Sequence, residues 1–356
     1  MTDEISAPIP LPRWSSDLPR LAGQIKSVPE DFLVEEIPAY EPSGSGEHLY
    51  LWVEKRALAG EQMLRELARA LEISPGEIGS AGIKDRQAVT RQWLSVPAKC
   101  EPQVAGVETD QFRILRFARH GNKLRTGHLR GNRFTIVVRD AQPADGSDVA
   151  EPFSIAERAV EVIGRRGFPN YYGDQRFGHD GETLSLGLDL LAGRKSPRDI
   201  PYSRRKFLLR MSLSAAQSEL FNQTLAARLT DGLLDTVLAG DVMEVTASGG
   251  KFVVEDPGAE QKRCDGYETV VTGPMFGPKM KQPTGIPAER ESRVLSANEL
   301  TMENFRGFGD LLSGTRRPFV VRPDGISVQA VPEGLRFEFT LPAGVYATTL
   351  LAELLG

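Results

Sequence analysis

The sequence predicts an α+β protein in which the two strand-rich ends of the chain form one domain around a more helical middle. At 356 residues the chain is longer than a single hydrophobic core usually supports, so two domains are expected. Segments with the alternation of β-strands occur early, in "DFLVEEIP" and "GEHLYLWVEKR", and again late, in "GLRFEFTLP". Residues 204–240 instead repeat apolar residues at three- and four-residue steps, as amphipathic helices do. The two ends are therefore expected to belong to one discontinuous domain.

The other elements of the chain follow from the same patterns. The segment "GEQMLRELARALEIS" is predicted as a helix because Met63, Leu67 and Leu71 recur on one face, and the Ser-Pro-Gly sequence at 74–76 is expected to end it. Further strands are expected at "QWLSVP", "FRILRFARH" and "RFTIVVRD". Helices are expected over "AERAVEVIG" and over the final "VYATTLLAELLG".

Composition excludes several classes of protein. The chain is 40% apolar and 26% charged, which is ordinary for a soluble globular enzyme. No stretch is apolar enough to cross a membrane, and the acidic, Pro-rich start lacks the basic end of a signal peptide, so a cytoplasmic protein is expected. Two cysteines and four histidines are scattered without metal-ligand spacing, and no phosphate-binding Gly-rich loop precedes a helix. Chemistry without a metal or a nucleotide cofactor is therefore expected.

Positive charge is concentrated in two stretches, although the net charge of the chain is −5. Residues 111–140 contain eight lysines and arginines against one aspartate, and residues 194–210 contain seven against one. On an acidic chain such local asymmetry indicates a confined polyanion site rather than non-specific binding. Two solvated faces would give the same composition, so the pattern alone leaves both interpretations open.

One aspartate stands out in "SAGIKDRQAVTRQW", residues 80–93, where Asp85 lies between Lys84 and Arg86. The flanking cations favour the ionised carboxylate and lower its pKa. Such a group suits a nucleophile or an electrostatic role better than that of a general acid at neutral pH. A salt-bridged surface turn would have the same sequence, so a structural role stays open at this point.

Aromatic and polar side chains alternate in two further stretches. In "HLRGNRFTIVV", Asn132 could contact the edge of a nucleobase and Phe134 could stack on its face. Alternatively, Phe134 belongs to the core and Asn132 to a turn. The stretch "FPNYYGDQRFG", residues 168–178, has the composition of a surface for single-stranded RNA. A domain junction packed around rigid turns has the same composition, and from these residues alone the junction is favoured.

Six motifs, in order along nearly the whole chain, resemble those of the TruD family of tRNA pseudouridine synthases. "AGIKDRQAVT" is similar to the family's AGxKDxxAVT, "GNRF" to GNxF and "PNYYGDQRFG" to PNYFGxQRFG. The others are "IKSVPEDFLVEE" near the start, "SAAQSELFN" for SAxRSxLFN and "LPAGVYAT" for LPAGSFAT. Any one of these matches could arise by chance, but six in the family's order are a specific signal.

The resemblance implies a pseudouridine-synthase-type catalytic domain of mixed sheet and helices, made of residues 1–166 and 319–356. An α/β TRUD domain would be inserted between these parts at 167–318. The implied reaction is the isomerisation of uridine to pseudouridine in tRNA, in this family at position 13, with no cofactor. The implied partner is tRNA. No protein partner is implied, and a monomer is favoured.

The resemblance also implies roles for particular residues. Asp85 would be the catalytic aspartate, acting either by attack on the sugar or base or by removal of a sugar proton. The predicted substrate-binding residues are Phe32, Asn132, Tyr346, Phe134, Lys26 and Lys84.

Three positions depart from the family's pattern. Tyr346 and Tyr172 stand where the family usually has phenylalanine, which keeps the ring and adds a hydroxyl group. Gln217 replaces an arginine and removes a positive charge. Two rival hypotheses are an RNA-binding protein that has lost catalysis and a methyltransferase. The intact Asp85 disfavours the first, and the lack of a cofactor-binding Gly-rich loop disfavours the second.

Overall fold

The computed structural model of the chain describes residues 11–82, 84, 86–146 and 151–355. These residues form two compact units, and each is described here by itself. The large-sheet unit comprises Leu18–Arg166, Arg322–Ala347 and residues 354–355, and the helix-rich unit comprises residues 11–17, Gly167–Val321 and Thr348–Glu353. Both units are discontinuous, and the predicted α+β fold class is confirmed. The functional domain boundaries predicted at 167 and 318 stay a prediction.

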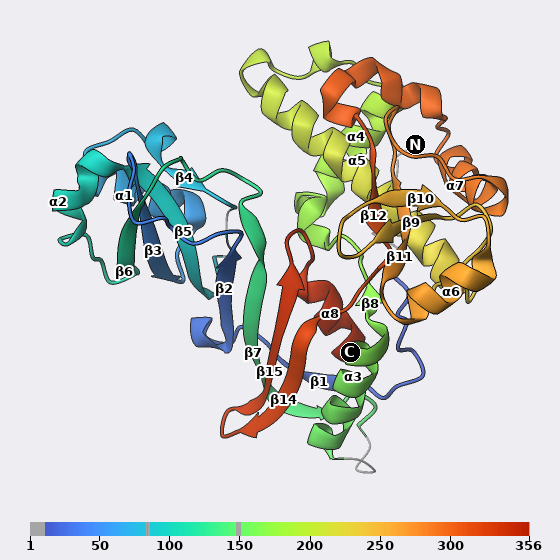
Figure 1. The fold of residues 1–356 in the computed structure, drawn as a ribbon, viewed down its shortest axis with the longest axis horizontal. Coiled ribbons are helices and arrows are strands. Elements are labelled where there is room, and N and C mark those ends of the chain that lie inside the picture. The colour runs from blue at the N-terminus through green and yellow to red at the C-terminus, as the bar shows by residue number, and fades with distance from the viewer. Residues whose placement is uncertain (1–10, 83, 85, 147–150, 356) are drawn as a thin grey trace. The chain divides into compact units, whose positions relative to one another are not determined.

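The large-sheet unit is built on a nine-stranded sheet in the order β14-β15-β7-β2-β5-β3-β6, with β1 added beside β7 and β4 beside β5. Figure 1 shows strands from the start, middle and end of the chain side by side in it. Its strands are β1 (Leu21–Gln24), β2 (Phe32–Pro38), β3 (His48–Arg56), β4 (Gly79–Ser80), β5 (Val89–Pro97), β6 (Phe112–His120), β7 (Leu129–Pro143), β14 (Asp324–Val331) and β15 (Gly334–Pro342).

The alternation of the central strands places a defined set of side chains on one face of this sheet. In β2 the buried residues are Phe32, Val34 and Glu36, which are two residues apart and therefore share a face. The antiparallel register sets Val34 opposite Phe134 and Glu36 opposite Asn132 on β7. A shift of one residue would turn all of these side chains to the other face, so this register positions the candidate site.

A helix and the neighbouring strands form a separate core in this unit. Apolar residues of β3 and β5 pack on Met63 and Leu67 of α1 (Gly60–Ala70). The helix ends at Ala70, before the predicted Ser-Pro-Gly stop. The N–H of Ile73 donates to the carbonyl of Ala68, and Glu72 adopts a left-handed φ of 53°. This is a Schellman motif without the usual glycine, which is why the sequence pattern did not reveal it.

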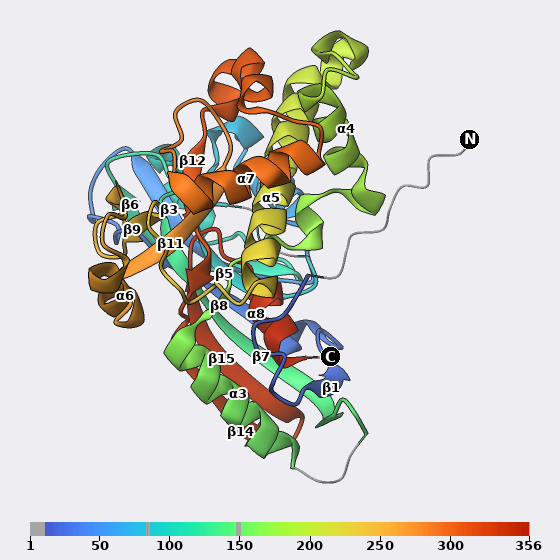
Figure 2. The same ribbon diagram turned by 90° about the vertical axis from the view of Figure 1, so that its right-hand side faces the viewer.

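Two more helices complete the large-sheet unit. They are α2 (Glu101–Val104) and α3 (Pro152–Arg166). The longer one, α3, lies against β14 and β7, as Figure 2 shows. This agrees with the helix predicted over "AERAVEVIG".

The helix-rich unit packs five helices with two small sheets. Its helices are α4 (Glu182–Leu191), α5 (Tyr202–Thr230), α6 (Pro257–Asp265), α7 (Gly285–Ala297) and most of α8 (Ala347–Leu354). Its strands are β8 (Phe168–Pro169), β9 (Val242–Val245), β10 (Lys251–Val253), β11 (Thr269–Met275), β12 (Thr315–Pro318) and β13 (Val320–Val321). Four strands form a sheet in the order β10-β9-β11-β12, and β8 pairs with β13.

The long helix α5 organises the core of the helix-rich unit. From Ser212 onward most of its residues are buried, and Leu213, Leu220 and Phe221 are fully covered. It packs against α4 at Gly187, where a Cβ atom would overlap the Ser212 carbonyl oxygen. Among the described residues, no helix is both long and apolar enough to span a membrane.

Candidate active site

The predicted catalytic residue, Asp85, lies outside the described residues, as does Ile83. Its neighbours in the chain, Lys84 and Arg86, are described. The site is therefore built from Lys84 and from the other predicted substrate-binding residues. All of these belong to the large-sheet unit.

Lys84 is fixed over the centre of the sheet by residues from two strands. Its Nζ donates to Oδ1 of Asn132 at 2.5 Å and lies 3.5 Å from Oε2 of Glu36. These two partners face each other across β2 and β7. The side chains of Lys84 and Glu36 are 8% and 0% exposed, so water screens this ion pair only weakly.

The contact with lysine also orients the amide of Asn132. Lysine has only hydrogen-bond donors, so the atom that faces its Nζ must be the amide oxygen. No described residue accepts a hydrogen bond from the amide nitrogen of Asn132, and its two N–H donors remain available. Such donors match the carbonyl oxygens of uracil.

Glu36 is the residue of this site that the sequence analysis missed. Burial raises the pKa of its carboxyl group, and the positive charge of Lys84 acts in the opposite direction. Lys84 is the charge that compensates Glu36, and the backbone N–H of Trp93 also favours its ionised form. The available signal was the alternation of β2, which turns Glu36 inward with Phe32 and Val34.

Three aromatic rings pack beside Asn132 on the same face. The ring of Phe32 packs edge to face against that of Phe134, with 6.2 Å between the ring centres. Phe134 stacks on Phe339 of β15, with 5.3 Å between the ring centres. The ammonium of Lys26 lies 4.2 Å from the centre of the Phe32 ring. Phe32 and Phe134 are only 2% and 7% exposed, so they form a buried floor, and their contact with a nucleobase stays a prediction.

Tyr346 follows the end of β15 that lies beside Asn132. Pro342, the last residue of β15, lies opposite Gly131, the neighbour of Asn132. The chain beyond is tied down where the N–H of Ala343 donates to the carbonyl of Arg130. The structure therefore brings Lys84 into contact with Asn132. It also places Lys26 over Phe32, which in turn packs against Phe134. Tyr346 lies in the chain just after β15, the strand that pairs with the "GNRF" segment.

The glycine of the "GNRF" segment is explained by a close approach of two strands. A Cβ atom at Gly131 would overlap the carbonyl oxygen of Leu341 on β15. Any larger residue would push β15 away from β7 beside Asn132.

Comparison with known proteins identifies the family of the chain. A model of the family described as tRNA pseudouridine synthase D (TruD) matches residues 11–196 and 203–354. The chain belongs to the TruD family. It is 43% identical over 344 residues to tRNA pseudouridine synthase D of Anaeromyxobacter dehalogenans strain 2CP-C, covering 97% of this chain and 96% of that protein.

Other TruD proteins align over similar lengths. The chain is 42% identical over 357 residues to tRNA pseudouridine synthase D of Thermus thermophilus, covering 99% of this chain and 94% of that protein. A crystal structure of a TruD chain from Methanosarcina mazei superposes with a TM-score of 0.74 at 24% identity, covering 97% of this chain and 96% of that one. This structural likeness shows the fold alone.

Two of the departures from the TruD motifs lie within the helix-rich unit. Gln217 is buried, and its amide nitrogen donates to the carbonyl of Phe276 at 2.6 Å. The side chain at this position therefore contributes to packing within the helix-rich unit. Tyr172 lies under the guanidinium of Arg317, 4.1 Å from the centre of its ring, and its N–H donates to Asn222.

The first basic stretch is largely neutralised by carboxylates from other segments of this TruD chain. Five of its eight cations form ion pairs, namely Arg113 with Glu54, Arg116 with Glu41, Arg119 with Glu101, Arg133 with Glu35, and Arg139 with Asp31. Arg125 and Arg130 are exposed and have no acidic partner in the described part of the chain. A phosphate-binding role is therefore better supported for these two arginines than for the stretch as a whole.

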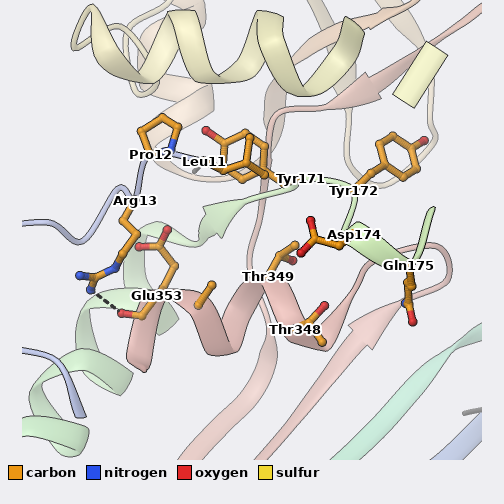
Figure 3. A pocket seen from close by; sticks show the side chains of 12 residues that line it. Leu11, Pro12, Arg13, Tyr171, Tyr172, Asp174, Gln175, Thr348, Thr349 and Glu353 are labelled. Atoms are coloured by element: carbon orange, nitrogen blue, oxygen red, sulfur yellow. Dashed lines mark hydrogen bonds between the residues drawn. The ribbon is translucent and has the colours of Figure 1, made fainter. Parts of the chain in front are cut away.

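The cavity drawn in Figure 3 belongs to the helix-rich unit and contains none of the predicted site residues. Its volume is about 510 Å³, and it is lined by residues 11–13, 171–175 and part of α8. Arg13 donates to the main-chain oxygen of Glu353 at 2.8 Å at its edge. Tyr171 is 4% exposed, and burial together with the charge of Glu353 raises the pKa of its phenol. The "PNYYGDQRFG" motif of TruD proteins thus builds packing and a cavity here.

Proposed function

We propose that this chain isomerises a uridine of tRNA to pseudouridine, at position 13, with Asp85 as the catalytic residue and without a cofactor. The observation that carries the proposal is the fixed position of Lys84, the residue before Asp85, on Asn132 and Glu36. The relatives described as tRNA pseudouridine synthase D, which align over nearly the whole chain, support the substrate and the reaction. In this proposal residues 1–166 and 319–356 form the catalytic domain, and 167–318 the inserted one.

The reaction requires one ionised carboxylate and a pocket for an unstacked nucleotide. The N1–C1′ bond breaks, the uracil turns, and a bond forms between C5 and C1′. C5 loses a proton and N1 gains one, so the product is an isomer of the substrate. Asp85 assists either by attacking the sugar or base or by removing a sugar proton, and both routes need the charged form. Lys84 favours that form as the adjacent cation.

The neighbouring residues would hold the base once it has left the helical stack. The N–H donors of Asn132 are suited to a uracil carbonyl oxygen, and Tyr346 supplies a ring for stacking. Stacking on a protein ring recovers about 1–3 kcal/mol per base, which offsets part of the cost of unstacking. Phe32 and Phe134 pack on the same face of the sheet as Asn132 and would support its position.

The proposal is tested by mapping pseudouridine in unmodified tRNA transcripts after incubation with the purified chain, a chelator and no nucleotide. We expect product at position 13 and none in a matched transcript that carries cytidine there. Absence of product in the uridine transcript, or equal product from the cytidine transcript, would contradict the assignment. The same assay separates the isomerase from an RNA-binding protein without catalysis and from a methyltransferase.

A further inference from the structure

The second basic stretch, residues 194–210, forms a surface that the proposed active site does not use. It leads into the first turns of α5 in the helix-rich unit. The matched ranges of the family model leave out residues 197–202, which lie at the approach to this helix.

Large aromatic side chains are exposed on these turns. Tyr202 is 88% exposed and Phe207 is 64% exposed, whereas α5 is mostly buried from Ser212 onward. The inner side of the same turns is occupied, because Leu208 and Leu209 pack against the core of the unit. The outer side therefore presents two rings on a rigid helix, which is unusual for a surface without a ligand.

The cations of the stretch divide into two groups. Arg194 and Lys195 both pair with Asp189, at 2.9 Å each. Arg204, Lys206 and Arg210 are exposed, and no described residue forms an ion pair with any of them. Among the described residues, most of the positive charge of the stretch without an acidic partner thus lies on the first turns of α5.

Helical spacing arranges these side chains in adjacent rows. Tyr202, Lys206 and Arg210 are four residues apart and form one row about 12 Å long. Phe207 lies in the neighbouring row. The guanidinium of Arg205 lies 5.6 Å from the centre of the Tyr202 ring. It also donates to the carbonyl of Ile200, so it is held in place beside the ring.

We infer that this outer surface of α5, formed by Tyr202, Arg204, Lys206, Phe207 and Arg210, binds an unpaired segment of the tRNA substrate, an inference that rests on the proposed function. The rings stack on bases, and the three cations contact the phosphates between them. Interleaved rings and uncompensated cations are the features of surfaces for single-stranded nucleic acid. A neutral protein surface would gain nothing from these uncompensated cations.

The charge part of the inference is tested in the full chain with the double variant Lys206→Gln/Arg210→Gln. We expect tRNA binding to weaken about tenfold and the slope of log affinity against log salt to fall by about 1.5. The matched control is Arg194→Gln/Lys195→Gln, which removes the same charge from the same stretch and should change affinity less than about twofold. Turnover by the control variant should stay unchanged, because neither Arg194 nor Lys195 belongs to the proposed surface or to the proposed active site.

The stacking part is tested with Tyr202. Tyr202→Ala should weaken tRNA binding about tenfold, and Tyr202→Phe should keep wild-type affinity because the ring remains. Unchanged affinity and salt slope in the double variant, or equal losses in it and its control, would overturn the inference and leave this face to a protein partner. A wild-type chain that binds tRNA but forms no pseudouridine would contradict the proposed function instead, so the two failures are distinguishable.

Discussion

The ion pair between Lys84 and Glu36 gives the sharpest prediction of stability. The change is Lys84→Met, which keeps a long, flexible side chain and removes the charge. Glu36 would then be a carboxylate with 0% exposed side chain and no compensating cation at the 3.5 Å that now separates the two groups. The backbone N–H of Trp93 also favours the ionised form of Glu36, but it carries no charge that could replace that of the lysine.

The magnitude follows from the distance and the burial. Two unit charges 3.5 Å apart attract by about 5 kcal/mol at an effective dielectric constant of 20. Removing one partner of a buried pair typically costs about 3–5 kcal/mol. The carboxyl group can reduce this cost by taking up a proton, since burial already raises its pKa. We therefore expect the free energy of unfolding to fall by about 3 kcal/mol at pH 8.

The sign of the pH dependence is fixed by the direction of this pKa shift. In the variant the folded-state pKa of Glu36 rises further above its unfolded value, because Lys84 no longer opposes the effect of burial. The protonated, folded form is favoured below the unfolded pKa, and stability is lost as the pH rises through the folded pKa. The deficit of Lys84→Met should therefore shrink between pH 8 and about pH 5.

The assay is urea unfolding at both pH values, followed by tryptophan fluorescence, since Trp52 and Trp93 both lie in the large-sheet unit. The control is the double variant Lys84→Met/Glu36→Gln, in which no buried charge is left. It should recover about 2 kcal/mol of the loss at pH 8. An equal deficit at both pH values, or a double variant as unstable as the sum of its parts, would refute the reasoning.

Three further predictions concern the strands around the site and the surface beside it. Gly131→Ala should lower the free energy of unfolding by about 2 kcal/mol, measured by urea denaturation, because its Cβ would overlap the Leu341 carbonyl. Asp31→Asn should cost about 2 kcal/mol at pH 7, because the hydrogen bond from Arg139 lowers the pKa of Asp31. That stabilisation is present above the unfolded pKa and lost as the pH falls, so the cost should vanish toward about pH 2 in acid titrations. Arg130→Gln should reduce the salt slope of tRNA binding by about 0.8.

Each of these has an outcome that would contradict it. Wild-type stability in Gly131→Ala would mean that β15 moves away at no cost. A pH-independent cost in Asp31→Asn would remove the electrostatic explanation. For Arg130 the matched control is Arg119→Gln, since Arg119 already bonds Glu101, and equal salt slopes in the two variants would return Arg130 to an ordinary solvated surface.

The sequence predicted the class of the fold and the location of most elements because these depend on local patterns. The alternation of β2 and the three- and four-residue spacing of α1 and α3 are visible in short windows of residues. The end of α1 was not visible in the sequence, because Glu72 adopts the left-handed conformation that glycine usually adopts at the end of a helix. A stop signal that depends on backbone geometry leaves no trace in residue type.

The site residues proposed from the sequence stay a prediction, and the contacts among them were not visible in the sequence. The pairing of Phe134 with Phe339 and of Glu36 with Asn132 depends on the register of strands that are distant in sequence. The basic stretch at 111–140 was overestimated for the same reason, because its neutralising carboxylates come from other parts of the chain, such as Glu54 on β3. Charge counted along a sequence does not include partners across a sheet.

The most direct test of the central claim is a single-turnover measurement of pseudouridine formation by Asp85→Asn beside the wild-type chain, with tRNA affinity measured for both. The substitution keeps the shape of the side chain and removes its charge. We predict that product formation falls below detection while affinity stays within about threefold of wild type, as expected when a group acts only in the chemical step. Product formation by Asp85→Asn at a rate comparable to wild type would contradict the assignment of this aspartate and, with it, the proposed mechanism.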